Sequence, residues 1–450
     1  MMCKIKRICI ISLLIIIFFY NSCSATEKKV LILYDSYKAF TSDYSNLNNI
    51  IKLIMSSKTV NIQINKLNLT MNNINEYDNL IVINNENNDY SKSTCEKLSL
   101  YNGNILWFTD NYREVKEAVK NIHMRAAKIA IFKPSIDDYK TKNLIIDEIK
   151  DNNNPKNEKY LILNRVYPFI DLNQFIEKVD FLYDKGIPFI CEAMPVYENV
   201  DFVSMKRFGE VLRYAQSKGG RVMLKAPIFY MGDPGGEEVM ERTQLAFTNY
   251  LKYQVYPIGF SISDRWIYKE EYRPIINISD TIILEKDQNL NALDFENLHI
   301  DAYKKVMEKF DVGDLEAAKK QTNPIGLAIN SDYSLSEFKE KISSITNKGM
   351  KFNDICEVET RVKLKENEII NKENNIYLNN ILQYQGKFLS RTELEEIYSQ
   401  DKTNEIKNTS SLLDISKVNR LILIFTIVVC VVFAIIAYLG GIIDRRKYFK

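Results

Sequence analysis

The feature that most constrains the fold is a regular alternation of apolar runs and amphipathic segments in the middle of the chain. Strands are predicted to begin near residues 160, 187, 221 and 257. Their separation of roughly 30 residues is that of a strand followed by a helix. Two later strands, 281–284 and 325–329, and a helix at 334–346 extend the pattern. About seven such units predict a (β/α) barrel over residues 158–355.

Polar and charged residues follow four of these predicted strands. In barrel folds, active-site residues lie in the loops after the carboxyl ends of the strands. The same loops carry aromatic residues, including Phe169 and Phe229, whose flat rings suit contact with sugars. We therefore expect a binding pocket formed by Asn164, Arg165, Tyr167, Glu192, Tyr197, Lys225, Tyr230 and Trp266. The glycine-containing segment 229–236 is predicted to be a loop that covers this pocket.

The two ends of the chain predict export and membrane anchoring. A basic start, a short apolar run and small residues up to Ala25 indicate a signal peptide over residues 1–25; an uncleaved anchor is the alternative. Residues 421–443 are predicted to form a transmembrane helix, because 23 mostly apolar residues can cross a bilayer. The basic tail, 444–450, is then cytoplasmic. The chain is thus predicted to be a single-pass protein of the cell membrane with a large ectodomain outside the cytoplasm.

The regions that flank the barrel have patterns of their own. Residues 26–125 alternate strand and helix signals and predict a small α/β sandwich of flavodoxin-like type, with a mostly parallel sheet. Residues 126–157 are predicted to be a connection. Residues 356–400 show the alternation of antiparallel strands and predict a small β-rich extension. Polar residues 401–420 then form a stalk to the membrane.

Composition excludes some classes of function. The formal net charge is +2 among 450 residues, which gives no electrostatic reason to expect a nucleic acid partner. The chain has only two histidines, His123 and His299. They fall in different predicted domains, and each is expected to be structural. No cofactor is expected.

Several segments in the barrel region resemble a bacterial family distantly related to polysaccharide deacetylases, the DUF2334 group. The segments are 161–172, Gly186-Ile-Pro-Phe189, 193–202 and Gly219-Gly220 ahead of a strand that ends in Ala226-Pro227. They occur in order and with the right spacing. The resemblance implies a deformed (β/α) barrel of the polysaccharide-deacetylase (NodB-like) type and a role with glycans, often in exopolysaccharide production.

The sequence departs from that family at the metal site. The resemblance implies two aspartates at the positions of Asn164 and Arg165, and a histidine at the position of Lys225. Asparagine is a weak metal ligand, and the cationic side chains repel a metal ion. We therefore expect no metal and a degenerate, catalytically impaired domain. Its Lys225 ammonium takes the place of the metal and pairs with Glu192, unless the two are separate, partly solvated charges.

Three functions remain open at this stage. The first is a membrane-anchored pseudoenzyme that binds or organises a surface polysaccharide or its synthesis machinery. The second is an active carbohydrate hydrolase or deacetylase that uses Glu192 and Asp264 as its catalytic acids. The third is a scaffold for a membrane glycan-synthesis complex, with a glycosyltransferase as partner. The sequence favours binding over catalysis.

Overall fold

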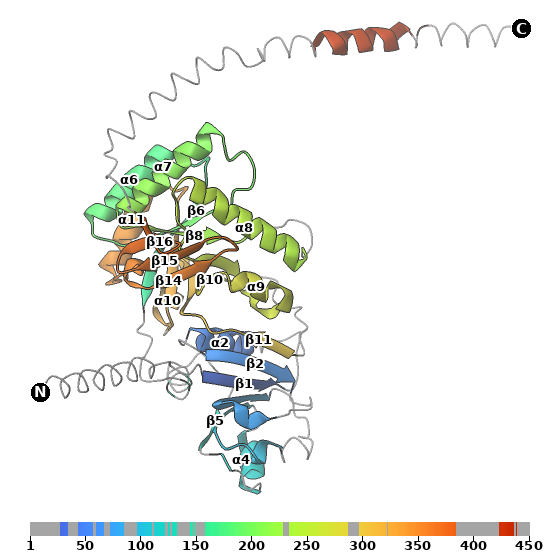
Figure 1. Cartoon of the computed structure of the whole chain (residues 1–450), viewed down its shortest axis with the longest axis vertical. Helices are drawn as coiled ribbons and strands as arrows, with labels where there is room; N and C mark the ends of the chain where they lie inside the picture. Colours follow the sequence, from blue (N-terminus) through green and yellow to red (C-terminus); the bar gives the residue numbers. More distant parts are fainter. Residues whose placement is uncertain are drawn as a thin grey trace, which may run out of the picture. The chain divides into compact units, whose positions relative to one another are not determined.

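The computed structural model describes most of the barrel region and the core of the region before it. The described residues are 28–34, 44–56, 60–66, 73–84, 97–109, 112–121, 125–126, 128–132, 145, 147, 149, 158–227, 234–286, 297–321, 323–383, 423–435 and 438. They form an open sheet, a closed barrel and a small antiparallel sheet (Figure 1). Residues 1–386 make one compact unit, and residues 387–450 make another.

The first sheet is a six-stranded layer near the N-terminus. Its order is β11-β2-β1-β3-β4-β5, and its five N-terminal strands are parallel. They are β1 (Lys28–Tyr34), β2 (Val60–Lys66), β3 (Asn79–Asn84), β4 (Asn104–Thr109) and β5 (Lys128–Phe132). The order 2-1-3-4-5 is that of flavodoxin-like folds. The structure differs from the sequence expectation at β5, which belongs to this sheet and lies in the segment 126–157 predicted to be a connection.

The sixth strand of this sheet comes from the barrel half of the chain. Strand β11 (Asn297–Ile300) pairs antiparallel with β2, with Asn297 opposite Asn65 and Ile300 opposite Ile62. Figure 1 shows it, in yellow, beside the blue strands. The sequence did not predict this strand. The two regions are therefore interwoven, and they do not follow one another as separate domains along the chain.

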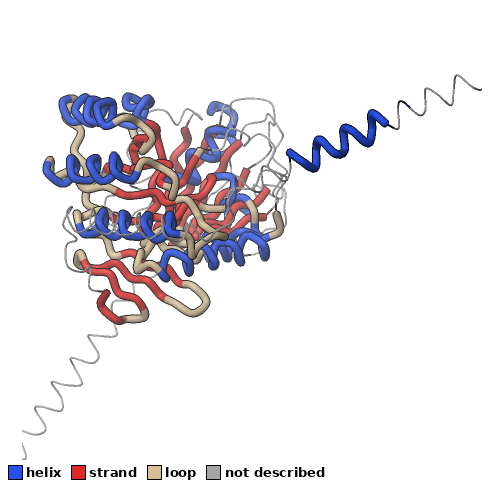
Figure 2. The backbone as a smooth tube through the Cα atoms, turned by 90° about the horizontal axis from the view of Figure 1, so that it is seen from above, coloured by secondary structure: helices blue, strands red, loops and turns tan. Residues whose placement is uncertain are grey.

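The second sheet is a closed barrel of seven parallel strands, which confirms the predicted barrel. Its order is β10-β12-β13-β6-β7-β8-β9. The strands are β6 (Lys159–Val166), β7 (Ile190–Ala193), β8 (Arg221–Lys225), β9 (Phe260–Ser263), β10 (Thr281–Glu285), β12 (Lys305–Asp311) and β13 (Ile325–Asn330). The associated helices are α6 (Leu172–Asp184), α7 (Val203–Ser217), α8 (Gly236–Lys252), α9 (Arg273–Ile276), α10 (Leu315–Lys319) and α11 (Leu335–Asn347). Figure 2 shows helices around the outside of the strands.

Local sequence signals explain the first strand and helix of the barrel. The side chains from Tyr160 to Leu163 in β6 are all buried, as expected for a parallel strand covered on both faces. Asp171 caps α6 by accepting a hydrogen bond from the Gln174 backbone N–H at 3.0 Å. Helix α6 then buries Phe175 and Val179 on the face towards the barrel.

Helix α2 (Tyr44–Met55) of the first sheet also packs against the barrel. One face of α2 buries apolar residues such as Ile50 and Ile54. The same helix carries Lys52, whose ammonium lies 2.6 Å from the Asp264 carboxylate in the short helix η2 (Asp264–Tyr268) after β9. Along the chain, strand β10 of the barrel is followed by strand β11 of the first sheet. Helix α2 contacts β12, which is the barrel strand next to β10. The first region thus supplies a helix to the wall of the barrel.

A four-stranded antiparallel sheet follows the barrel, as the alternation after residue 356 predicts. Its strands are β14 (Thr360–Lys363), β15 (Glu368–Lys372), β16 (Asn375–Leu378) and β17 (Ile381–Gln383). It is held to the amino end of β8 by Arg221, whose guanidinium donates to the Asn371 side chain at 3.0 Å and to the Asn374 carbonyl at 2.9 Å. The extension therefore belongs to the same compact unit as the barrel.

The predicted membrane segments stay predictions. Within the described part of the chain, no helix is both long and apolar enough to cross a bilayer. The predicted span 421–443 is described as helix only at 423–435 and 438. The signal peptide, residues 1–25, and His123 lie outside the described residues.

Candidate functional site

Asn164 and Arg165 lie at an irregularity at the carboxyl end of β6. The register between β6 and β7 shifts between Leu163 and Val166, so the two residues sit in a bulge. Arg165 has a left-handed backbone with φ of 57°, which is uncommon for a residue other than glycine. The Asn164 side chain stabilises it by accepting from the Arg165 backbone N–H at 2.7 Å. The bulge turns the mostly exposed Arg165 towards Asp332, at 3.8 Å, and leaves Asn164 facing a cavity.

A chain of charged groups crosses the barrel at the carboxyl ends of its strands. Lys225 at the end of β8 donates to both carboxylate oxygens of Glu285 at 2.7 Å. Glu285, at the end of β10, also accepts from Lys309 of β12. Lys309 reaches Glu192 of β7 at 2.5 Å. We call Lys225, Glu285, Lys309 and Glu192 the mouth network.

The expected pair of Lys225 with Glu192 is therefore not formed directly. Lys225 pairs with Glu285, and Lys309 stands between Glu285 and Glu192. The physical reason is the arrangement of the strands around the barrel, because β12 places a second lysine between the two carboxylates. The sequence did not predict this strand. The second oxygen of Glu192 accepts from the Ser261 hydroxyl of β9 at 2.6 Å. Glu192 is 0 % exposed, and both of its carboxylate oxygens have a donor.

The network shifts the ionisation of two of its members. For Glu285, burial by itself raises the pKa, but the Lys309 and Lys225 ammonium groups outweigh it and hold the pKa below its usual range. For Lys309, burial lowers the pKa, but Glu192 and Glu285 outweigh it and raise the pKa above its usual range. Both groups are thus held in their charged forms. This favours a permanent ion-paired network over a proton donor or acceptor poised near neutral pH.

Asp264, the second candidate acid, lies in a different environment. Its carboxylate is 0 % exposed and contacts Lys52 at 2.6 Å and the Asn48 amide at 3.5 Å. Lys52 also contacts Glu308 at 3.4 Å, and Asn48 accepts from the Tyr268 hydroxyl at 2.5 Å. Asp264 therefore joins α2 to the barrel and does not pair with Glu192.

A cavity of about 560 Å³ opens beside the mouth network. Asn164 of β6 and Glu285 of β10 line it together with the carboxyl end of β12 and the segment after that strand. The lining residues are Asn164, Glu285, Lys286, Glu308, Lys309, Phe310, Asp311, Asp314 and Ala317. The volume is in the range of small-molecule sites, and hydrogen-bonding side chains dominate its wall.

Aromatic residues lie in the loops after β6 and β7, as the sequence predicts. Phe169 is 82 % exposed, and Phe202 is also exposed. Tyr167 donates from its hydroxyl to Asp332 at 3.2 Å. The Tyr197 ring lies 5.8 Å from the Arg242 guanidinium, and burial raises the pKa of its hydroxyl.

Two further aromatic candidates have different outcomes. Trp266 is half-buried and packs on Phe260 and Tyr272, so it supports the loop after β9. Tyr230 and most of the predicted covering loop, residues 228–233, lie outside the described residues. Of the predicted aromatics that the structure describes, Phe169 therefore offers the most open ring.

The side chains at the mouth do not suit the metal ion that the resemblance to deacetylases implies. The carboxylates that could serve as ligands, Glu192 and Glu285, are already neutralised by Lys309. An incoming cation would meet the ammonium groups of Lys309 and Lys225. His299 lies in β11 of the first sheet and not in the barrel. In the described part of the chain, no cluster of three or more acidic, histidine or cysteine side chains forms a metal site.

Sequence reasoning missed Glu285, Lys309, Ser261 and Lys52. Glu285 directly follows the predicted strand 281–284, so the rule about strand ends could have found it. Lys309 is harder to find, because β12 carries charges at Lys305, Glu308 and Lys309 and does not look like a barrel strand.

No protein-family model matches the chain, so the resemblance to the DUF2334 group has no support from a family model. No curated protein matches it either. Among solved structures, the chain is similar to a peptidoglycan N-acetylglucosamine deacetylase, with 10 % identity and a TM-score of 0.24. The match covers 45 % of this chain and 87 % of that chain. A TM-score of this size carries no functional argument.

Proposed function

We propose that this protein binds a polysaccharide at the mouth of its barrel and does not deacetylate it by metal catalysis. In this proposal it is a membrane-anchored, extracytoplasmic pseudoenzyme of polysaccharide-deacetylase-like type. The observation that carries the proposal is the mouth network, in which two lysines occupy the centre of the barrel where catalytic groups are found in this class of fold.

The cavity beside the network suits a polyhydroxylated ligand. Carboxylates such as Glu285 and Asp311 accept hydrogen bonds, Lys286 donates them, and Asn164 can do both. Sugar hydroxyls likewise act as donors and acceptors. Phe169 lies in the loop after the strand that carries Asn164, and its exposed ring is available for stacking on a sugar.

Burial argues against the alternative of a hydrolase that uses Glu192 and Asp264. Both carboxylates are 0 % exposed, and each is ion-paired with a lysine. A general acid or base must come within hydrogen-bond reach of its substrate, directly or through one water. Neither side chain meets that requirement in this structure.

The test measures binding and acetate release with the same full chain. Affinity electrophoresis and calorimetry with chitin oligosaccharides, cellulose oligosaccharides and alginate should give binding to at least one of them without release of acetate or reducing ends. Phe169→Ala should weaken that binding about tenfold, because a lost aromatic contact is worth roughly 1–1.5 kcal/mol. Tyr183→Ala, which truncates an exposed ring on α6, is the matched control and should bind normally.

Two results would count against the proposal. One is the absence of binding across a broad glycan panel. The other is turnover of a glycan that Glu192→Gln abolishes while binding persists, which would restore the hydrolase hypothesis. A glycosyltransferase that co-purifies with the chain would support the broader role in glycan synthesis.

A further inference from the structure

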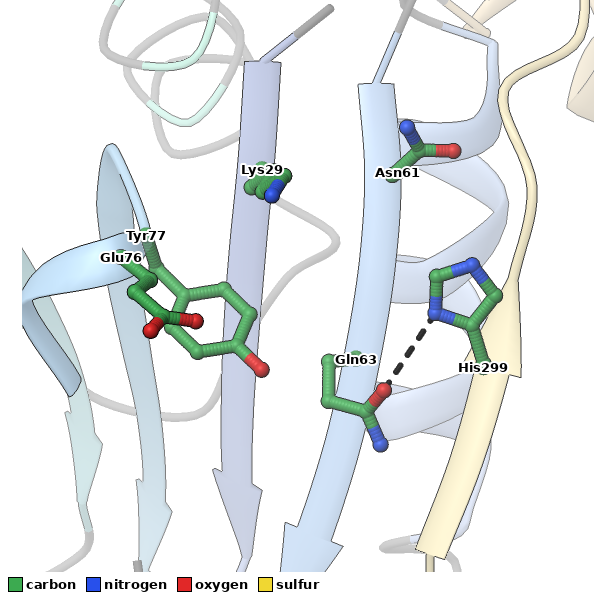
Figure 3. A pocket seen from close by; sticks show the side chains of 6 residues that line it. All are labelled: Lys29, Asn61, Gln63, Glu76, Tyr77 and His299. Atoms are coloured by element: carbon green, nitrogen blue, oxygen red, sulfur yellow. Dashed lines mark hydrogen bonds between the residues drawn. The ribbon is translucent and has the colours of Figure 1, made fainter. Parts of the chain in front are cut away.

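A second, smaller pocket lies on the first sheet, away from the barrel mouth. Its volume is about 220 Å³, and its wall consists of Lys29, Asn61, Gln63, Glu76, Tyr77 and His299. Figure 3 shows these side chains around the strands β1, β2 and β11. We call it the sheet pocket.

The sheet pocket is assembled from distant parts of the chain. Lys29 of β1 lies beside Asn61 of β2, and Gln63 of β2 lies beside His299 of β11. Because side chains alternate along a strand, these four residues share one face of the sheet. Tyr77 and Glu76 close the pocket from the segment before β3. The face is apolar at Leu31 and Leu33, which are buried in the core, and is polar towards the β2–β11 edge.

Hydrogen bonds fix the polar groups at this edge. Gln63 donates to the Asn65 side chain at 3.0 Å and also to Asn297. Its carbonyl oxygen lies 3.3 Å from Nδ1 of His299, the contact drawn in Figure 3. Nε2 of His299 lies 3.1 Å from Asp301. The amide and imidazole groups are therefore held in one orientation before any ligand arrives, which lowers the entropy cost of binding.

Two other groups in the sheet pocket have unused hydrogen-bonding capacity. In the described part of the chain, the Lys29 ammonium has no acidic partner and the Tyr77 hydroxyl makes no hydrogen bond. Figure 3 shows the Tyr77 ring crossing β1 with its hydroxyl directed towards the Gln63 side. The Glu76 carboxylate accepts from the Asn73 side chain at 2.8 Å through one oxygen. The pocket therefore offers one cation, one anion, a phenol, an imidazole and two amides.

This set of groups selects the chemistry of the ligand. A ligand with a net charge would be attracted by one of the Lys29 and Glu76 side chains and repelled by the other, so neither sign of charge is favoured. A neutral ligand rich in hydroxyl groups can use donors and acceptors together, and its apolar C–H face can rest on the Tyr77 ring. The volume is below the usual range for drug-sized ligands, which favours a single ring over a chain. We propose that the sheet pocket binds one neutral sugar ring, as a carbohydrate site independent of the barrel mouth.

The test uses ligand-observed NMR on the full chain with methyl glycosides of glucose, galactose and N-acetylglucosamine as probes. At least one should bind the wild-type chain. Lys29→Met and Tyr77→Phe should each weaken that binding at least fivefold without lowering the unfolding temperature, because neither the ammonium nor the hydroxyl has a partner among the described residues. Lys116→Met, which removes an exposed lysine from α4 (Tyr112–Asn121), is the matched control and should leave it unchanged.

The outcomes separate this inference from the proposed function. If Phe169→Ala weakens polysaccharide binding while the sheet-pocket variants keep it, and no methyl glycoside binding depends on Lys29 or Tyr77, the inference is overturned and the proposed function stands. If methyl glycosides bind through Lys29 and Tyr77 but no polysaccharide binds at the mouth, the inference stands and the proposed function is overturned. Acetate or phosphate that displaces the sugar and binds more tightly would show an anion site, and the inference would be wrong.

Discussion

The first sheet and the barrel place their charged groups in opposite ways. The first sheet has an apolar interior, with Leu31, Leu80 and Trp107 in one cluster, and the polar groups of its sheet pocket lie towards the edge at β2 and β11. The barrel has no open edge, and its mouth network lies inside the ring of strands. A closed sheet can thus surround charges with backbone and partners, whereas an open sheet leaves its polar groups beside solvent.

The contact between these two regions is itself an ion pair. Lys52 enters from α2 and meets Asp264 and Glu308 of the barrel side. The first region therefore depends on charge complementarity where it joins the barrel, in addition to the main-chain pairing of β11 with β2. Three predictions test how much each set of charges contributes.

Lys309→Met should have the largest effect on stability. It removes the partner of the buried Glu192 and one of two partners of Glu285. Breaking a buried pair from one side costs about 3–5 kcal/mol, and urea unfolding of the full chain should show a loss of this size. The double variant Lys309→Met with Glu192→Met should recover part of it, because no unpaired charge then stays at Glu192. A loss below about 1 kcal/mol in the single variant would mean that the network is open to water.

Lys52→Met should cost somewhat less, about 2–4 kcal/mol, because Asp264 keeps the Asn48 contact and Glu308 is partly exposed. The loss should appear as earlier opening of α2 and β2 in hydrogen exchange, while β6 and β7 stay protected. Lys116→Met on α4 should leave the protection of α2 and β2 unchanged, because Lys116 contacts, among the described residues, only the ring of Tyr112 on its own helix, at 5.5 Å. Equal loss of protection throughout the barrel would show that the two regions unfold only together.

The pH dependence should be the smallest effect, and its sign follows from the shifts. The pKa of Glu285 is lowered, so its contribution is present above its ordinary pKa near 4.5 and is lost as pH falls through the lower value in the folded state. The pKa of Lys309 is raised, so its contribution is present below its ordinary pKa near 10.5 and is lost only as pH rises through the higher folded value.

Urea unfolding followed against pH should check this. The wild-type chain should be less stable in acid than at neutral pH, and Glu285→Gln should show a weaker dependence below pH 5. An unchanged acid limb in that variant would contradict the role of Glu285.

Some of these features could be predicted from the sequence because their signals are local. The apolar run in β6, the Asp171 cap and the spacing of buried residues in α6 each lie within a few neighbouring residues. The positions of Asn164, Glu192 and Lys225 at strand ends followed from the same pattern.

The rest depended on contacts between distant residues. Strand β11 has only four residues, with Leu298 and Ile300 as its apolar face, and nothing in so short a segment specifies β2 as its partner. Which lysine meets Glu192 is decided by closure of the barrel, since Lys309 lies far along the chain from it. The pairing of Asp264 with Lys52 of α2 likewise depends on how the two regions pack together.

The place of β11 in the chain has a consequence for biosynthesis. A ribosome completes β1 to β5 long before it reaches residues 297–300, so the nascent first sheet carries an unpaired β2 edge through all of that time. Unpaired strand edges invite association with other chains. Newly made protein should therefore need a chaperone until the barrel half emerges and its strand covers the edge.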